Sequence, residues 1–396
     1  MSAIPPPATP TRRRIWPRLV LALAAMGLTL LAAEIAYRLK LKAGVGNLPL
    51  GMSQSFVAAN ETAREPHEQW GYTPLPDRQL ARLRVAQGQP VLYCPRQTNE
   101  LGNFEPPKPN WRQADMRILV FGDSCTATAG EGPDGVCWPT LWETALAERL
   151  DRDVCVLNFG RDGYGVLQML DLAQARCDEF APDMIVFALI ADDLTRQRLS
   201  PHAPQRDVPL EFVDADVTPE WCQAMLAAGG DADDPLLAKL VGRFDAACRH
   251  ASPIDYFTPA HSFLYNRLAK RDPFAHLPHK RLNQRIDLHD FSDDPQCVAA
   301  IQGLLARQIP LAFVQLTTYE DIRGGSYQMS GQQQQLLRSL ERLTGQPVLP
   351  LKTAFATKTP PEKLFLLPHD PHPSQAGLRL YSQAVDDALR DVIPKN

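Results

Sequence analysis

Two motifs far apart in this sequence hold side chains that could together carry out acyl chemistry. The first is Gly122-Asp123-Ser124, in which a serine follows a short apolar run. A serine on a sharp turn between a strand and a helix can present its hydroxyl as a nucleophile, and its own backbone N–H can face an adjacent oxyanion. The alternative interpretation is that Ser124 only caps the helix that follows, as serines often do.

The second motif is His369-Asp370-Pro371-His372, close to the end of the sequence. A carboxylate two residues from a histidine can hydrogen-bond one ring nitrogen and fix the tautomer, so that the other nitrogen can act as a base. Asp370 and His372 are therefore a candidate acid–base pair. In the opposing interpretation Asp370 and the nearby Ser374 cap the last helix and His372 is incidental. Two histidines beside an aspartate also suggest a metal, but no further ligands have a convincing spacing, so we predict no metal and no cofactor.

Two further loops follow apolar runs and contain groups that could bind a developing negative charge. The segment after Asn158 contains Gly160 and Gly163, which allow close approach of the backbone and can expose N–H groups. An ordinary glycine-rich turn would have the same composition. The other loop begins with Asp192 and Asp193, which by default form a solvated pair or a helix cap.

These four loops need a scaffold that brings them together. From residue 117 onward, short apolar runs alternate with amphipathic segments. Strands are expected at 118–121, 154–158, 184–190 and 311–316, and helices at 139–150, 166–180, 298–307, 332–343 and 375–390. Strands that are continuously apolar and separated by helices predict a mainly parallel sheet in a three-layer α/β/α fold. In such folds ligands bind at the carboxyl ends of the strands, which is where the loops lie.

In this order the motifs resemble the SGNH (GDSL-type) hydrolase family, whose four blocks supply Ser, Gly, Asn and His. The resemblance covers about residues 117–194 and 296–390. It implies a flavodoxin-like α/β fold, with Ser124 as the nucleophile, His372 as general base and acid, and Asp370 as the residue that orients it. It also implies an oxyanion hole made by the N–H groups of Ser124 and Gly163, because the family glycine usually follows the Asn of its block by five positions.

One block departs from the family pattern. Asp192 stands where the family carries Asn, and an ionised carboxylate cannot donate the hydrogen bond that the amide would give to the oxyanion. Three interpretations stay open. Burial keeps Asp192 protonated, or the site works with two backbone donors at a reduced rate, or the domain has lost catalysis and keeps a binding role.

The resemblance predicts a serine esterase that forms an acyl-enzyme and then completes either hydrolysis or O-acyl transfer. An O-acylated envelope carbohydrate is the first candidate substrate, while lipid and thioester substrates remain open. The alternative function is a catalytically weakened module that binds glycans or scaffolds an envelope assembly. The sequence has 41 basic and 45 acidic residues, a balance that argues against a nucleic-acid partner. Its eight cysteines are too few for a disulfide scaffold.

The rest of the chain predicts the compartment and the domain organisation. Residues 1–43 contain an uncharged stretch between basic flanks, with Trp16 and Tyr37 where an aromatic belt would lie. We expect an uncleaved single-pass anchor in the cytoplasmic (inner) membrane, with the catalytic domain in the periplasm; a cleaved signal peptide is the rival interpretation. Residues 44–116 are predicted to form an irregular leader packed on the core, and a subgroup of membrane-anchored bacterial relatives has a similar 98–102 segment. Residues 117–396 are predicted to form the SGNH-like hydrolase domain, with an insertion at about 195–293.

Overall fold

The computed structural model describes eleven stretches of the chain, and the account below concerns these residues alone. They are residues 15–40, 54–59, 64–67, 69–86, 89–128, 136–196, 198, 286–322, 329–356, 359–367 and 371–394. Most of the predicted insertion at about 195–293 lies outside the described residues, and so does Asp370.

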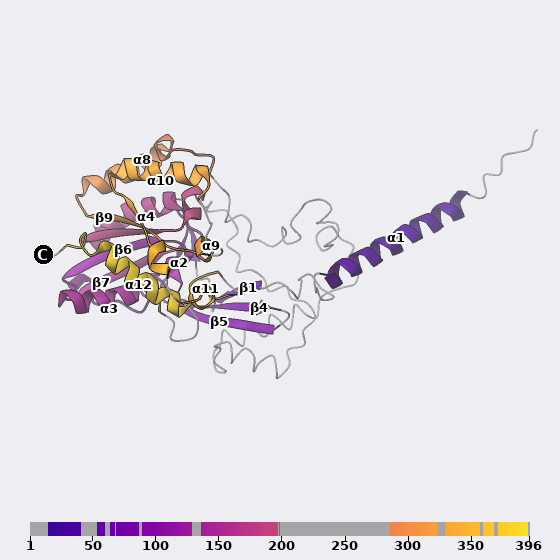
Figure 1. Ribbon diagram of the computed structural model, residues 1–396, viewed down its shortest axis with the longest axis horizontal. Coiled ribbons are helices and arrows are strands. Elements are labelled where there is room, and N and C mark those ends of the chain that lie inside the picture. Colours follow the sequence, from indigo (N-terminus) through magenta and orange to yellow (C-terminus); the bar gives the residue numbers. More distant parts are fainter. Residues whose placement is uncertain are drawn as a thin grey trace, which may run out of the picture.

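A five-stranded sheet forms the centre of the fold (Figure 1). In spatial order its strands are β10 (Val348–Pro350), β9 (Leu311–Gln315), β8 (Met184–Leu189), β6 (Met116–Gly122) and β7 (Val154–Gly160). Every neighbouring pair of strands is parallel. The chain passes from β6 to β7 at one edge and returns to β8 on the other side of β6, which is the flavodoxin-like order. The parallel α/β fold predicted from the apolar runs is thus confirmed.

Helices cover both faces of this sheet and give the three layers that the sequence predicts (Figure 1). The longer ones are α3 (Trp138–Leu150), α4 (Val166–Phe180), α8 (Pro295–Ala306), α10 (Gly331–Thr344) and α12 (Gln375–Leu389). Shorter ones are α2 (Ser124–Ala127), α9 (Tyr319–Ile322), α11 (Pro361–Leu364) and the 3₁₀ turns η2 (Trp111–Gln113), η3 (Ala191–Thr195), η6 (Phe291–Asp293) and η8 (Lys352–Phe355). On one face α3 packs beside α12, and on the other α4 packs against α8 with α10 alongside.

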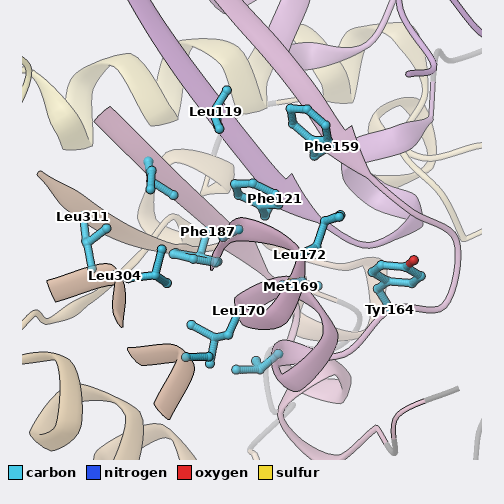
Figure 2. Close-up of a cluster of buried hydrophobic side chains, with 14 of the residues drawn as sticks. Leu119, Phe121, Phe159, Tyr164, Met169, Leu170, Leu172, Phe187, Leu304 and Leu311 are labelled. Atoms are coloured by element: carbon cyan, nitrogen blue, oxygen red, sulfur yellow. The ribbon is translucent and has the colours of Figure 1, made fainter. Parts of the chain in front are cut away.

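Phenylalanines of four neighbouring strands stack in the core cluster that packs against α4 and α8, and Figure 2 labels Phe121, Phe159 and Phe187 among them. Phe121 of β6 is directly opposite Phe159 of β7 and Phe187 of β8, and its ring centroid is 5.3 and 5.6 Å from theirs. Phe187 in turn stacks on Phe313 of β9 at 4.8 Å. Each such pair adds about 0.5–1.5 kcal/mol beyond its buried area. Because the rings are in register, the loops that follow these strands emerge at one level of the sheet.

The segment before the core differs from the irregular leader that the sequence predicts. β1 (Gln54–Ala59), β4 (Gln79–Ala86) and β5 (Gln89–Gln97) form an antiparallel sheet, and β2 (Arg64–His67) pairs with β3 (Gly71–Pro74). Pro90 and Pro95 argue against a strand from sequence alone, yet β5 is an edge strand, where proline is tolerated. The leader contacts the core through Tyr72, whose hydroxyl donates to the Asp162 carbonyl at 2.9 Å.

The N-terminal helix α1 spans Ile15–Lys40. In the part of the chain that the structure describes, no helix has the combination of length and apolarity needed to cross a membrane. The membrane anchor therefore stays a prediction.

Candidate active site

Ser124 lies at the turn between the end of β6 and the short helix α2. The residue that caps α2 is Asp123, whose Oδ1 accepts a hydrogen bond from the Cys125 N–H at 2.8 Å. The capping role that the sequence left open for the serine thus belongs to its neighbour. As the first residue of α2, Ser124 has a backbone N–H that the helix leaves without an intrahelical partner.

His372 lies in the loop before α12, and its Nε2 is 2.8 Å from the Oγ of Ser124. This is hydrogen-bond distance, and it is the arrangement in which an imidazole can take the proton of an attacking hydroxyl. The loop is held by its backbone, because the Leu366 N–H donates to the His372 carbonyl at 2.9 Å. Ser374 caps α12 by accepting from the Gly377 N–H at 3.3 Å. The capping interpretation is therefore correct for Ser374, but His372 is not incidental.

The glycine-rich segment that begins at the end of β7 packs directly against the helix that carries the serine. A Cβ on Gly160 would lie 2.6 Å from the backbone nitrogen of Ala127, so only glycine fits this approach. Gly163 has φ +78° in a turn closed by a hydrogen bond of 3.2 Å from the Tyr164 N–H to the Arg161 carbonyl. A positive φ at this turn position favours glycine. The oxyanion role of the Gly163 N–H stays a prediction.

Asp192 lies in η3, directly after β8, and its side chain is exposed. Its Oδ1 accepts a hydrogen bond of 3.2 Å from Nε2 of Gln333 at the start of α10. The interpretation in which burial keeps Asp192 protonated is therefore wrong, because the side chain is not buried. The buried member of the pair is Asp193, whose Oδ2 accepts from the Ile190 N–H at 2.9 Å.

A pocket of about 610 Å³ joins these loops at the carboxyl ends of the strands. Ser124, His372 and Asp192 all line it, as the strand-end rule predicts. Sequence reasoning missed the other polar lining residues, which are Asp123, Arg196, Thr318, Glu320, Ser330 and Gln333. Four of these residues lie where the strand-end rule could have pointed to them. Thr318 and Glu320 follow β9, and Ser330 and Gln333 are at the start of α10. The described residues contain no group of three or more His, Cys, Asp and Glu side chains able to hold a metal ion.

An ion cluster at the pocket joins Arg196 to two buried carboxylates. Arg196 Nη1 donates to Asp123 Oδ2 at 3.0 Å and to Asp193 Oδ1. Burial and the neighbouring Asp123 raise the pKa of Asp193, while Arg196 lowers it by less. Burial lowers the pKa of Arg196, but Asp193 and Asp123 raise it by more, so the guanidinium stays protonated.

Part of the sequence matches a known protein family. Residues 118–214 match the family of GDSL-like lipases and acylhydrolases. The matched segment includes Ser124, Gly163 and Asp192 and ends well before His372, which the fold brings to the serine. No curated protein matches the chain.

Solved structures with low sequence identity also resemble the chain. A lipase/acylhydrolase from Enterococcus faecalis is 13% identical, with a TM-score of 0.36, and the match covers 71% of this chain and 98% of that one. A catalytic mutant of an acetylxylan esterase from Geobacillus stearothermophilus is 15% identical, with a TM-score of 0.33 over 71% of this chain and 96% of that one. The family match over residues 118–214 and the serine–histidine pair together support an ester-bond hydrolase.

Proposed function

We propose that the protein removes, or transfers, a short acyl group carried as an ester on an uncharged, hydroxyl-rich alcohol such as an O-acylated envelope carbohydrate. The observation that supports the proposal most directly is the 2.8 Å contact between Ser124 Oγ and His372 Nε2 inside a pocket with several hydrogen-bonding side chains. Its chemistry would proceed through an acyl-enzyme on Ser124.

In the first half-reaction His372 Nε2 takes the Ser124 proton as Oγ bonds to the carbonyl carbon. The imidazolium then protonates the departing alcohol, which leaves the acyl group on the serine. In the second half-reaction the same nitrogen takes a proton from the incoming nucleophile. Water gives hydrolysis, and a sugar hydroxyl gives acyl transfer to a new ester.

The side chains around this pair favour a neutral polyol over a lipid or an anionic sugar. Thr318, Ser330 and Gln333 offer uncharged hydrogen-bonding groups, and Asp192 and Glu320 offer carboxylates that accept from hydroxyls. Asp123, Asp192 and Glu320 give the lining three carboxylic side chains, against the single guanidinium of Arg196 among the described lining residues. A substrate with its own carboxylate or phosphate would be repelled by this excess of acidic groups in the pocket.

A panel of esters tests the proposal. We expect Ser124-dependent release of acetate from acetylated neutral oligosaccharides, with kcat/KM at least about tenfold above that for acetylated uronic acids and for octanoyl esters, a difference of about 1.4 kcal/mol. Adding an unacetylated oligosaccharide and measuring its acetylation by mass spectrometry separates transfer from hydrolysis. Preference for the octanoyl ester would refute the proposed substrate class. No turnover and no labelling of Ser124 by a fluorophosphonate would favour the weakened binding module instead.

We further propose that α1 holds the protein at the cytoplasmic membrane, with the α/β domain on the periplasmic side. Large apolar side chains of α1 are exposed, among them Trp16 at 72%, Leu21 at 71% and Leu28 at 67%. Exposed apolar surface of this extent is typical of a segment that meets a membrane or another protein. The full chain should therefore sediment with membranes, whereas a chain that begins at residue 44 should not. Equal recovery of both proteins in the soluble fraction would contradict this proposal.

A further inference from the structure

The reaction of Ser124 with an ester would create an oxyanion, and at Asp192 the active site lacks a hydrogen-bond donor for it. When Ser124 Oγ bonds to the ester carbonyl carbon and its proton passes to His372, an electron pair of the C=O bond moves onto oxygen. Such an oxyanion is stabilised by hydrogen-bond donors that are already in place. Asp192 lies in the pocket, but its Oδ1 accepts from Gln333, and a carboxylate cannot donate.

A cationic side chain, that of Arg196, lies in the same pocket. Arg196 directly follows η3, four positions after Asp192, and lines the pocket with Ser124 and His372. Its Nη1 is 3.0 Å from Asp123 Oδ2, and Ser124 Oγ is 3.5 Å from that same oxygen. A single carboxylate oxygen therefore separates the guanidinium from the nucleophile.

The position of Arg196 is fixed without using all of its donors. Nη1 makes the bonds to Asp123, to Asp193 and, at 3.0 Å, to the Tyr164 carbonyl. Among the described residues, Nη2 and Nε have no hydrogen-bond partner, and the side chain is 15% exposed. An arginine held in this way is preorganised, since its charge and its unused N–H groups need not be rearranged during the reaction.

We propose that Arg196 is a catalytic residue, which stabilises the oxyanion in place of the amide donor that Asp192 cannot supply. This role rests on the proposed ester chemistry of Ser124. The guanidinium also offsets the negative charge that Asp192 brings into the pocket. The residue thus explains how a serine–histidine site can operate with a carboxylate at this position.

Two substitutions that compensate each other test the role. Arg196→Gln should lower kcat for p-nitrophenyl acetate about 10²-fold while KM changes by less than about threefold, because the lost interaction forms only in the transition state. Adding Asp192→Asn to Arg196→Gln should recover at least about tenfold, since the new amide can donate to the oxyanion. A merely structural role would lower the Tm and would not be repaired by Asp192→Asn.

Arg198→Gln is the matched control. Arg198 also pairs with two carboxylates, Asp171 and Asp294, but it does not line the pocket. Its loss should lower the Tm and leave kcat unchanged. If Arg196→Gln does not fold, Arg196→Lys replaces it in the test. One ammonium can pair with the buried carboxylates but has no second nitrogen for the oxyanion, so kcat should still fall at least about tenfold.

The outcomes separate this role from the proposed function. A folded Arg196→Gln or Arg196→Lys protein with kcat within about threefold of the wild type would overturn the role of Arg196, and so would an Asp192→Asn change that recovers nothing. In both cases the wild type would still show Ser124-dependent hydrolysis. A wild-type protein with no such hydrolysis would refute the proposed function, and the role of Arg196 with it.

Discussion

Replacing Ser124 by alanine is expected to lower kcat for ester hydrolysis by about 10⁴-fold or more, because the acyl-enzyme can no longer form. His372→Ala should cause a loss of the same order, since its Nε2, 2.8 Å from the hydroxyl, is the group placed to take the serine proton. The two residues act as one unit, so the double variant should be little worse than either single variant. Initial rates with p-nitrophenyl acetate, measured together with the Tm of each variant, check this expectation.

Ser339→Ala separates catalysis from the loss of a buried hydroxyl. Ser339 is a buried serine of α10 that accepts from the Phe291 N–H at 2.9 Å and donates to Asp290, and it does not line the pocket. Its replacement should lower stability by about 1 kcal/mol and leave kcat unchanged. If Ser124→Ala keeps more than about 1% of the wild-type kcat, a nucleophile other than Ser124 carries the reaction.

The sheet could be predicted from sequence where its strands are long, apolar and separated by helices. The runs at β6, β7, β8 and β9 are buried on both faces, so almost every position in them is apolar. β10 could not be found in this way, because it has only three residues and its strand character comes from pairing with β9. In the leader, β5 forms a hairpin with β4, but Pro90 and Pro95 argue against a strand there, so the sequence does not predict β5.

The site could be predicted in part for a similar physical reason. Ser124 and His372 lie in motifs whose local chemistry is informative, and the topology of a parallel sheet brings strand ends together. The exposure of Asp192 depends on the folded surface, so no local sequence pattern predicts it. Arg196 has no motif of its own, because its place beside the serine depends on Asp123, which belongs to a different loop.

A second polar cluster, away from the pocket lining, links the leader to β7. Glu105 is completely buried, and its Oε1 accepts from the Asn158 N–H at 3.1 Å and from Asn103 Nδ2 at 3.3 Å. Its Oε2 has no hydrogen-bond partner within the described part of the chain. The Nζ of Lys108 is 3.9 Å away and bonds to Glu143. Burial raises the pKa of Glu105 to about 7, although Lys108 lowers it. The free-energy cost of burying this carboxyl group in the folded chain therefore depends on pH.

Because folded Glu105 binds its proton more tightly than an unfolded chain with a pKa near 4.5, the free energy of unfolding should fall as the pH rises from about 4.5 to about 7. The contribution of this one group to that fall is up to about 3 kcal/mol. Glu105→Gln keeps the acceptor for the Asn158 N–H but does not titrate, so its stability relative to the wild type should improve over the same range. Urea unfolding at several pH values measures the difference, with exposed Glu179→Gln as the control that should leave the wild-type profile unchanged. Parallel profiles for Glu105→Gln and the wild type would mean that the buried carboxyl does not titrate in this range, and that Lys108 holds it ionised throughout.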